Sequence, residues 1–118
     1  MILREVKKIL DAEVLCGESL LDLKVKTCFA CDLISEMLIY VNPSTLLITS
    51  LTNAHIIHTA QVMDAVGVVF VGGKKPDEVI IKNSDLSNIP LLSTPHLIFD
   101  CCGLLFGNGI KGDKKNSC

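Results

Sequence analysis

The second half of the chain repeats one pattern three times: a short apolar run, a cluster of small polar residues, and a segment with helical spacing. The apolar runs occupy residues 46–48, 68–71 and 89–92. They are too short to be helices and are apolar on both faces, which is typical of buried parallel strands. Strands that alternate with helices predict βαβ units. We therefore expect an α/β fold, a small single-domain sandwich with a mostly parallel sheet.

The rest of the pattern predicts the flanking elements. Two further short strands are expected at residues 13–16 and 23–25, and helices at about 3–11, 32–39, 53–65, 76–81 and 95–105. Asn53 is a favourable cap for its helix, and Pro76 suits a first helical turn because proline lacks an N–H group that would be unpaired there. Residues 108–118 contain three lysines and two glycines and are expected to form a disordered tail, which leaves 1–107 as the predicted domain.

Composition excludes several classes of protein. With 118 residues, of which 49% are hydrophobic, the chain is long enough to bury a core and too apolar to be disordered. A net charge of −2 and only five aromatic residues (four Phe and one Tyr) argue against nucleic acid as a partner. No apolar run approaches the roughly 18 residues that span a bilayer, so no membrane partner is expected. The mean hydropathy of +0.48 is high for a small domain and predicts a two-fold homodimer.

Six cysteines are distributed along the chain. The segment 1–10 has helical spacing of its apolar residues instead of the uninterrupted apolar stretch of an export signal, so reduced thiols in a cytoplasmic protein are expected. Cys28 and Cys31 form a C-x2-C pair that could supply half of a zinc site or a redox dithiol. No second pair has a suitable spacing, and the acidic neighbour Asp32 would disfavour a thiolate. Incidental thiols are therefore favoured, and we expect no metal and no cofactor.

The three histidines add no metal-binding pattern. His55 and His58 are three residues apart on a predicted helix and share a face, a spacing that can bind a metal ion. No carboxylate lies between them and no HExxH motif is present, so solvated helix histidines are favoured. His96 lies near the predicted ligand edge without a nucleophile that it must serve.

The predicted strands indicate where a ligand would bind. Parallel strands of an open sheet end at one edge, and the loops that follow them meet there. Gly72 and Gly73 would let backbone N–H groups approach an anion, Lys74 adds positive charge, and the helix that follows adds its dipole. No Walker loop and no G-x-G-x-x-G motif is present, so a tight solvated turn is an equal alternative. The expected ligand-binding residues are Thr49, Thr52, Asn53, Gly72, Gly73, Lys74, Ser93 and Thr94.

Four segments of the chain resemble the DRTGG domain family. They are Phe29-Ala30-Cys31-Asp32-Leu33-Ile34-Ser35 preceded by Asp22, then Leu47-Ile48-Thr49-x-Leu51-Thr52-Asn53, Val69-Phe70-Val71-x-Gly73-Lys74-Lys75-Pro76-Asp77-Glu78 and Ile89-Pro90-Leu91-Leu92-Ser93-Thr94. The resemblance extends over residues 3–106. The glycine pair that names the family is replaced here by Thr27 and Cys28.

This resemblance implies a fold similar to the amino-terminal domains of HPr kinase/phosphorylase and of Mur ligases, in which the domain is an accessory unit. It supplies no catalytic residues, and the chain lacks the phosphate-binding loop of such a kinase, so no enzymatic activity is expected.

Two function classes remain. The first is a non-catalytic regulatory or sensor domain that binds a small anionic ligand, for example a nucleotide, at the carboxyl edge of the sheet. The second is a protein–protein interaction or dimerisation module without a small-molecule ligand. A cavity lined by Asn53, Gly73 and Thr94 would favour the first class, and a flat or filled edge the second.

Overall fold

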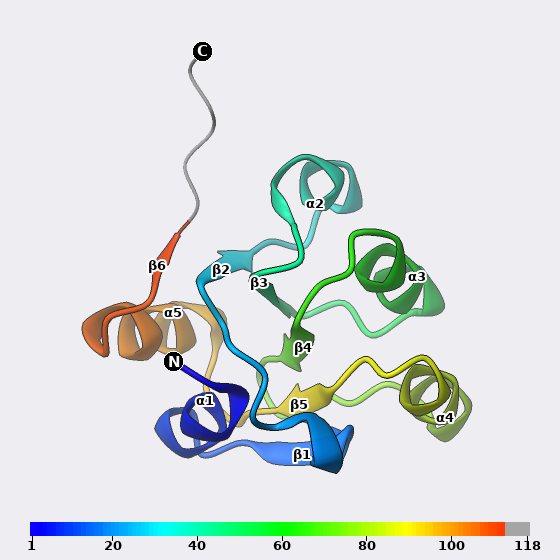
Figure 1. Ribbon diagram of the computed structural model, residues 1–118, viewed down its shortest axis with the longest axis horizontal. Helices are drawn as coiled ribbons and strands as arrows, with labels where there is room; N and C mark the ends of the chain where they lie inside the picture. The colour runs from blue at the N-terminus through cyan, green and yellow to red at the C-terminus, as the bar shows by residue number, and fades with distance from the viewer. Residues whose placement is uncertain (113–118) are drawn as a thin grey trace.

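The computed structural model describes residues 1–112, which form a three-layer α/β/α sandwich (Figure 1). Its central sheet has the strand order β1-β5-β4-β3-β2-β6 within the described residues. The strands are β1 (Glu13–Cys16), β2 (Thr27–Ala30), β3 (Thr45–Thr49), β4 (Gly67–Phe70), β5 (Leu91–Ser93) and β6 (Lys111–Gly112). Only β1, which pairs with β5, runs antiparallel to its neighbour. The predicted α/β fold with a mostly parallel sheet is confirmed.

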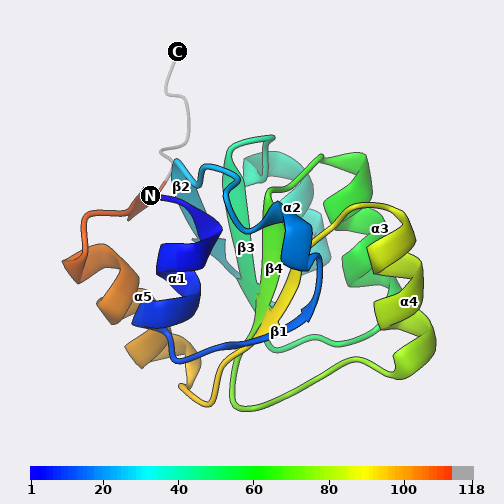
Figure 2. The same ribbon diagram turned by 60° about the horizontal axis from the view of Figure 1, so that its bottom comes forward.

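Helices cover both faces of this sheet. They are α1 (Leu3–Ile9), α2 (Ile34–Tyr40), α3 (Ala54–Val62), α4 (Glu78–Leu86) and α5 (Ile98–Gly107), with a short 3-10 helix, η1 (Glu18–Leu20). Figure 2 shows α1 and α5 side by side on one face of the sheet, and α2, α3 and α4 on the other. Across residues 1–112, every helix is too short or too polar to cross a bilayer.

Two hydrophobic clusters fill the spaces between the layers. Leu46 and Ile48 of β3 belong to the cluster beneath α1 and α5, whereas Leu47 belongs to the cluster beneath α2, α3 and α4. All five residues of β3 are buried. Because successive side chains of a strand point to opposite faces, a strand that is covered on both sides is apolar at successive positions, as at residues 46–48. This explains the continuous apolar runs in the sequence.

Side-chain caps fix the starts of two helices. The Asn53 side chain accepts a hydrogen bond from the Ile56 backbone N–H at 3.3 Å, which confirms the predicted cap of α3. The Asp77 side chain accepts a hydrogen bond from the Ile80 N–H at 3.0 Å, and α4 begins at the next residue, Glu78. Each cap satisfies one N–H group that the first helical turn would leave unpaired.

The prediction of a strand at residues 23–25 is wrong. Lys24 forms only an isolated antiparallel bridge with Ile2, and the regular strand β2 begins at Thr27. Alternation of apolar and polar residues covers only 23–26, so the sequence places the strand too early, and the partner strand fixes its position. That partner is β3, where Thr27 pairs with Thr45 and Ala30 with Ile48.

The chain remains packed beyond the predicted boundary at residue 107. Ile110 is buried in the cluster beneath α1 and α5, and Lys111 and Gly112 pair with Thr27 and Cys28 of β2. The prediction that residues 108–112 are disordered is therefore wrong. Burial of Ile110 anchors this segment to the core. The rest of the expected tail, 113–118, lies outside the described residues.

Candidate functional site

The loops that follow the parallel strands meet at the carboxyl edge of the sheet, as the sequence predicts. A cavity of about 280 Å³ opens there. It is lined by Asp32 from the loop after β2, Ser50 from the loop after β3, Val71, Gly72 and Lys74 from the loop after β4, and Leu97 and Ile98 from the start of α5. We refer to it as the edge cavity.

Asp32 holds two of these loops together. Its Oδ1 accepts hydrogen bonds from Thr49 Oγ1 and from the Ser50 backbone N–H, both at 2.7 Å, and its Oδ2 accepts one from Ser50 Oγ. Burial alone would raise the pKa of Asp32. The hydrogen bonds from Ser50 and Thr49, together with the charge of Lys74, outweigh burial and hold the pKa below its ordinary value. The edge cavity therefore presents a carboxylate at neutral pH.

Acid should weaken this connection, because the lowered pKa of Asp32 means that the folded state favours the ionised carboxylate. The stabilisation is fully present above the unfolded pKa of 3.8 and is lost as the pH falls through the lower folded value. Asp32→Asn is expected to unfold at lower urea concentration than the wild type at pH 7, with the difference shrinking below about pH 4. Glu18→Gln, at an exposed carboxylate on η1, is the matched control. A difference between Asp32→Asn and the wild type that stays constant with pH would contradict this assignment.

The backbone amides expected to face an anion are already paired. The Gly72 N–H donates to the His96 carbonyl and the Gly73 N–H to the Thr94 carbonyl, both at 2.8 Å. Both glycines have positive φ, 69° and 71°, a conformation that explains why glycine occupies this turn. Gly72 lines the edge cavity and Gly73 does not. Any polar contact from this loop to a ligand must therefore come mainly from the Lys74 side chain.

The two hydroxyls expected from β5 and its loop serve the fold. Ser93 Oγ donates to the Lys74 carbonyl at 2.7 Å, and Thr94 Oγ1 donates to the Leu10 carbonyl at 2.6 Å. Both residues are buried. Ser93 thus fixes the backbone of the lysine that borders the cavity, and Thr94 connects the sheet to the end of α1.

The remaining expected residues lie at different distances from the edge cavity. Thr49 is fully buried behind the edge cavity, and its hydroxyl donates a hydrogen bond to Asp32, which lines the cavity. Thr52 and Asn53 lie at the start of α3, outside the cavity lining, and the Asn53 side chain is used as the cap. Lys75 pairs with Glu13 at 2.9 Å. Lys74 is thus the lysine of this loop that lines the cavity.

The expected ligand-binding residues lack five of the residues that line the edge cavity: Asp32, Ser50, Val71, Leu97 and Ile98. Asp32 would have been found if residues 27–30 had been assigned as a strand, because it then follows a parallel strand just as Ser50 and Gly72 do. The cavity also differs from the one lined by Asn53, Gly73 and Thr94 that the first function class anticipated.

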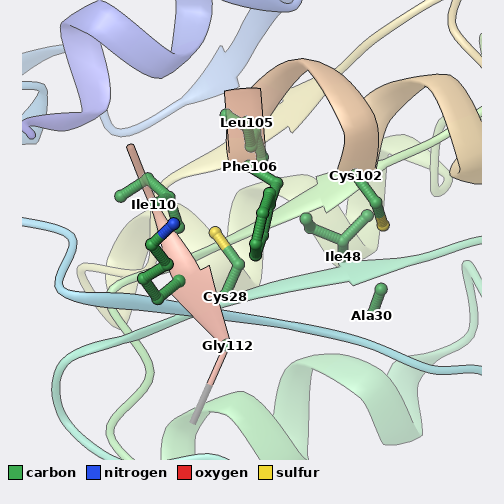
Figure 3. A pocket seen from close by; sticks show the side chains of 9 residues that line it. Cys28, Ala30, Ile48, Cys102, Leu105, Phe106, Ile110 and Gly112 are labelled. Carbon is green, nitrogen blue, oxygen red and sulfur yellow. The ribbon is translucent and has the colours of Figure 1, made fainter. Parts of the chain in front are cut away.

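A second cavity, of about 170 Å³, lies between β2, β6 and α5 (Figure 3). Figure 3 shows the Cys28 and Phe106 side chains pointing into this space. Burial, with a smaller contribution from the thiols of Cys101 and Cys102, raises the pKa of Cys28 to about 12, and burial also raises the pKa of Cys101 to about 12. Thiols with such pKa values are protonated at neutral pH and are poor nucleophiles and metal ligands.

The two cysteines of the C-x2-C pair lie on opposite faces of the sheet. Cys28 packs against the cluster beneath α1 and α5, whereas Cys31 packs against the cluster beneath α2, α3 and α4. The two thiols therefore face opposite layers and cannot share a metal ion or form a disulfide with each other. Within residues 1–112, no three His, Cys, Asp or Glu side chains are grouped closely enough to hold a metal ion.

Comparisons with known proteins agree with this fold. The DRTGG domain family matches the sequence over residues 5–105. A solved structure of the CBS and DRTGG domains of the regulatory region of Clostridium perfringens pyrophosphatase, complexed with its activator diadenosine tetraphosphate, superimposes with a TM-score of 0.71 at 18% identity. The match covers 88% of this chain and 45% of that one, so this chain spans less than half of the pyrophosphatase fragment. No curated protein matches the sequence.

Proposed function

The chain belongs to the DRTGG domain family, and we propose that it is a non-catalytic regulatory domain that binds a nucleotide at the carboxyl edge of its sheet. The observation that carries this proposal is the edge cavity, which combines an apolar wall with one facing lysine. The nucleotide activator bound to the regulatory region of the pyrophosphatase that shares this fold adds support.

Different side chains of the edge cavity suit the base and the phosphates of a nucleotide. Val71, Leu97 and Ile98 supply apolar surface, on which the flat face of a base can be buried. Lys74 is exposed at the rim, where its ammonium group can pair with a phosphate. Asp32, which is also exposed, would repel a phosphate placed beside it, and its remaining acceptor capacity suits a sugar hydroxyl. This arrangement predicts the base inside and the phosphates at the rim.

The free thiols and the side chains of the edge cavity support two further parts of the proposal. Each of the five described cysteines is a free thiol, which fits a reducing compartment, and we place the domain in the cytoplasm. The hydroxyls at the edge are engaged by Asp32 or by backbone carbonyls, and none is paired with a histidine base. A binding role therefore fits the edge better than a catalytic one.

Calorimetric titration with AMP, ADP, ATP and diadenosine tetraphosphate tests the proposal. Charge-assisted hydrogen bonds contribute about 1.5–3 kcal/mol, and for an exposed lysine the lower value applies, so Lys74→Ala should weaken binding of the best ligand about tenfold. Lys8→Ala, an exposed lysine on α1, is the matched control and should leave the affinity unchanged. Adenosine and inorganic tripolyphosphate, titrated separately, measure the contributions of the two halves.

Two outcomes would contradict the proposal. If no nucleotide binds, the edge cavity is not a nucleotide site and the interaction-module alternative gains. If Lys74→Ala and Lys8→Ala weaken binding equally, the lysines act through net charge alone and the nucleotide binds elsewhere.

A further inference from the structure

The polar side chains that line the edge cavity differ in what they offer a ligand. Asp32 and Ser50 come from the loops after β2 and β3, and Lys74 comes from the loop after β4. Because the Ser50 hydroxyl donates its hydrogen to Asp32 Oδ2, the Asp32 and Ser50 side chains can only accept a hydrogen bond from a ligand. Lys74 can only donate one. A ligand that uses both kinds of contact carries a hydrogen-bond donor and an anionic group.

Asp32 has room for one more strong hydrogen bond. Its Oδ1 already accepts from Thr49 Oγ1 and from the Ser50 N–H, both at 2.7 Å, whereas among the described residues its Oδ2 accepts from Ser50 Oγ alone. Each carboxylate oxygen has about two lone-pair sites, so one site on Oδ2 is left for a ligand. Asp32 is exposed, and the existing hydrogen bonds hold its carboxylate in one orientation. It is thus a reachable acceptor that needs no reorganisation to bind a donor.

Asp32 and Lys74 lie close enough for their charges to interact. Burial raises the pKa of Asp32, the hydrogen bonds from Ser50 and Thr49 lower it, and the charge of Lys74 lowers it further. A ligand group on Asp32 is therefore a near neighbour of the group on Lys74. When a nucleotide lies with its base on the apolar wall and its phosphates at Lys74, the part between them is the sugar. The hydrogen-bond donors of the sugar are its hydroxyl groups.

The two hydroxyls of a ribose are not equivalent in this position. The 3′ carbon is bonded to the 4′ carbon, which carries the arm with the phosphates, whereas the 2′ carbon is bonded to the carbon that carries the base. The ionised Asp32 repels the phosphates, so the hydroxyl farther from them is the favoured partner of its carboxylate. That group is the 2′-hydroxyl, which ribonucleotides have and deoxyribonucleotides lack.

We propose that Asp32 makes the edge cavity selective for ribonucleotides, by accepting a hydrogen bond from the ribose 2′-hydroxyl at Oδ2. This inference rests on the proposed function, because it requires a nucleotide in the edge cavity. A bound 2′-deoxyribonucleotide still covers the carboxylate but offers it no donor, so Asp32 loses hydrogen bonds to water without a replacement. The ligand of the domain is therefore a ribonucleotide, and Asp32 is the residue that determines this specificity.

Calorimetric titration of the wild type compares the tightest binder among AMP, ADP and ATP with its 2′-deoxy and 3′-deoxy forms. The 2′-deoxy form should bind about tenfold more weakly, the lower end of the effect of a hydrogen bond to a charged group. The 3′-deoxy form should bind with nearly the affinity of the ribonucleotide. If no nucleotide binds, the proposed function fails and this inference fails with it. If the ribonucleotide and the 2′-deoxy form bind equally, or only the 3′-deoxy form binds more weakly, the nucleotide site stands and the assignment to the 2′-hydroxyl is wrong.

Two variants test whether Asp32 is the source of the selectivity, which is measured as the ratio of the two affinities on one protein. A neutral amide forms hydrogen bonds about half as strong as those of a carboxylate, so Asp32→Asn should reduce the ratio from about tenfold to about threefold or less. Lys74→Ala should weaken binding of both nucleotides and leave the ratio unchanged, because the lysine pairs with the phosphates of either one. Glu18→Gln, at an exposed carboxylate on η1, should change neither affinity. A tenfold ratio that persists in Asp32→Asn, or one that Lys74→Ala abolishes, would overturn the role of Asp32.

Discussion

Phe70→Ala is expected to lower the free energy of unfolding by about 3–5 kcal/mol, since large-to-small substitution removes buried apolar surface and leaves a cavity. Phe70 is among the largest side chains with no exposed surface. It ends β4 in the middle of the sheet and packs in the cluster beneath α2, α3 and α4. Three helices depend on that cluster, so the cavity cannot be closed by movement of a single loop. Urea unfolding measures the loss.

Phe99→Ala is the matched control, because it makes the same chemical change at a side chain that is 85% exposed. It should change the free energy of unfolding by no more than about 0.5 kcal/mol. Equal effects of the two substitutions would mean that the β4 position is not part of the core.

The central strands were predictable because their signal is local. Residues 45–49 and 67–70 are covered on both faces, so burial makes their central positions apolar, and no partner needs to be known to recognise them. The caps of α3 and α4 are equally local, because Asn53 and Asp77 act on N–H groups three residues away. The fold class follows from the order of these elements along the chain.

The strands β2 and β6 were not predictable, because neither carries a complete strand pattern of its own. β2 is only partly buried, and its place within residues 23–30 is set by pairing with β3 and β6. β6 has two residues and no strand pattern of its own. It exists because Ile110 is buried beneath α1 and α5. Both strands are thus fixed by tertiary contacts that one sequence does not reveal.

The candidate site was predictable as a place but not as a set of contacts. The strand pattern brings residues 49–53, 72–74 and 93–94 to one edge, and of these Gly72 and Lys74 line the edge cavity. Whether an amide or hydroxyl faces a ligand depends on whether another group already binds it. The Gly72 and Gly73 N–H groups are paired with the carbonyls of His96 and Thr94. The Thr94 hydroxyl is paired with the carbonyl of Leu10, which is far away in the sequence and comes close only in the folded chain.

Gly17→Ala is the second substitution with a large expected effect, a loss of about 2–5 kcal/mol. Gly17 precedes η1 and has a φ of 84°, a left-handed conformation that costs other residues about 1–2 kcal/mol. A Cβ atom there would lie 2.7 Å from the Pro90 Cα, which is backbone and cannot rotate away. Relief of the overlap must separate the end of β1 from the start of β5, at a cost of about 1–3 kcal/mol. It would also strain the hydrogen bond from the Gly17 N–H to Asp85 Oδ1.

Gly73→Ala separates the two causes of this loss. Gly73 has a similar φ of 71°, but a Cβ atom there would meet nothing within 4 Å. It therefore incurs the conformational cost alone and should lower the free energy of unfolding by only about 1 kcal/mol. The difference between the two variants in urea unfolding measures the close approach of Gly17 to Pro90. If both variants lose the same free energy, the β1–β5 connection relaxes without resistance, and Gly17 is required only for its backbone conformation.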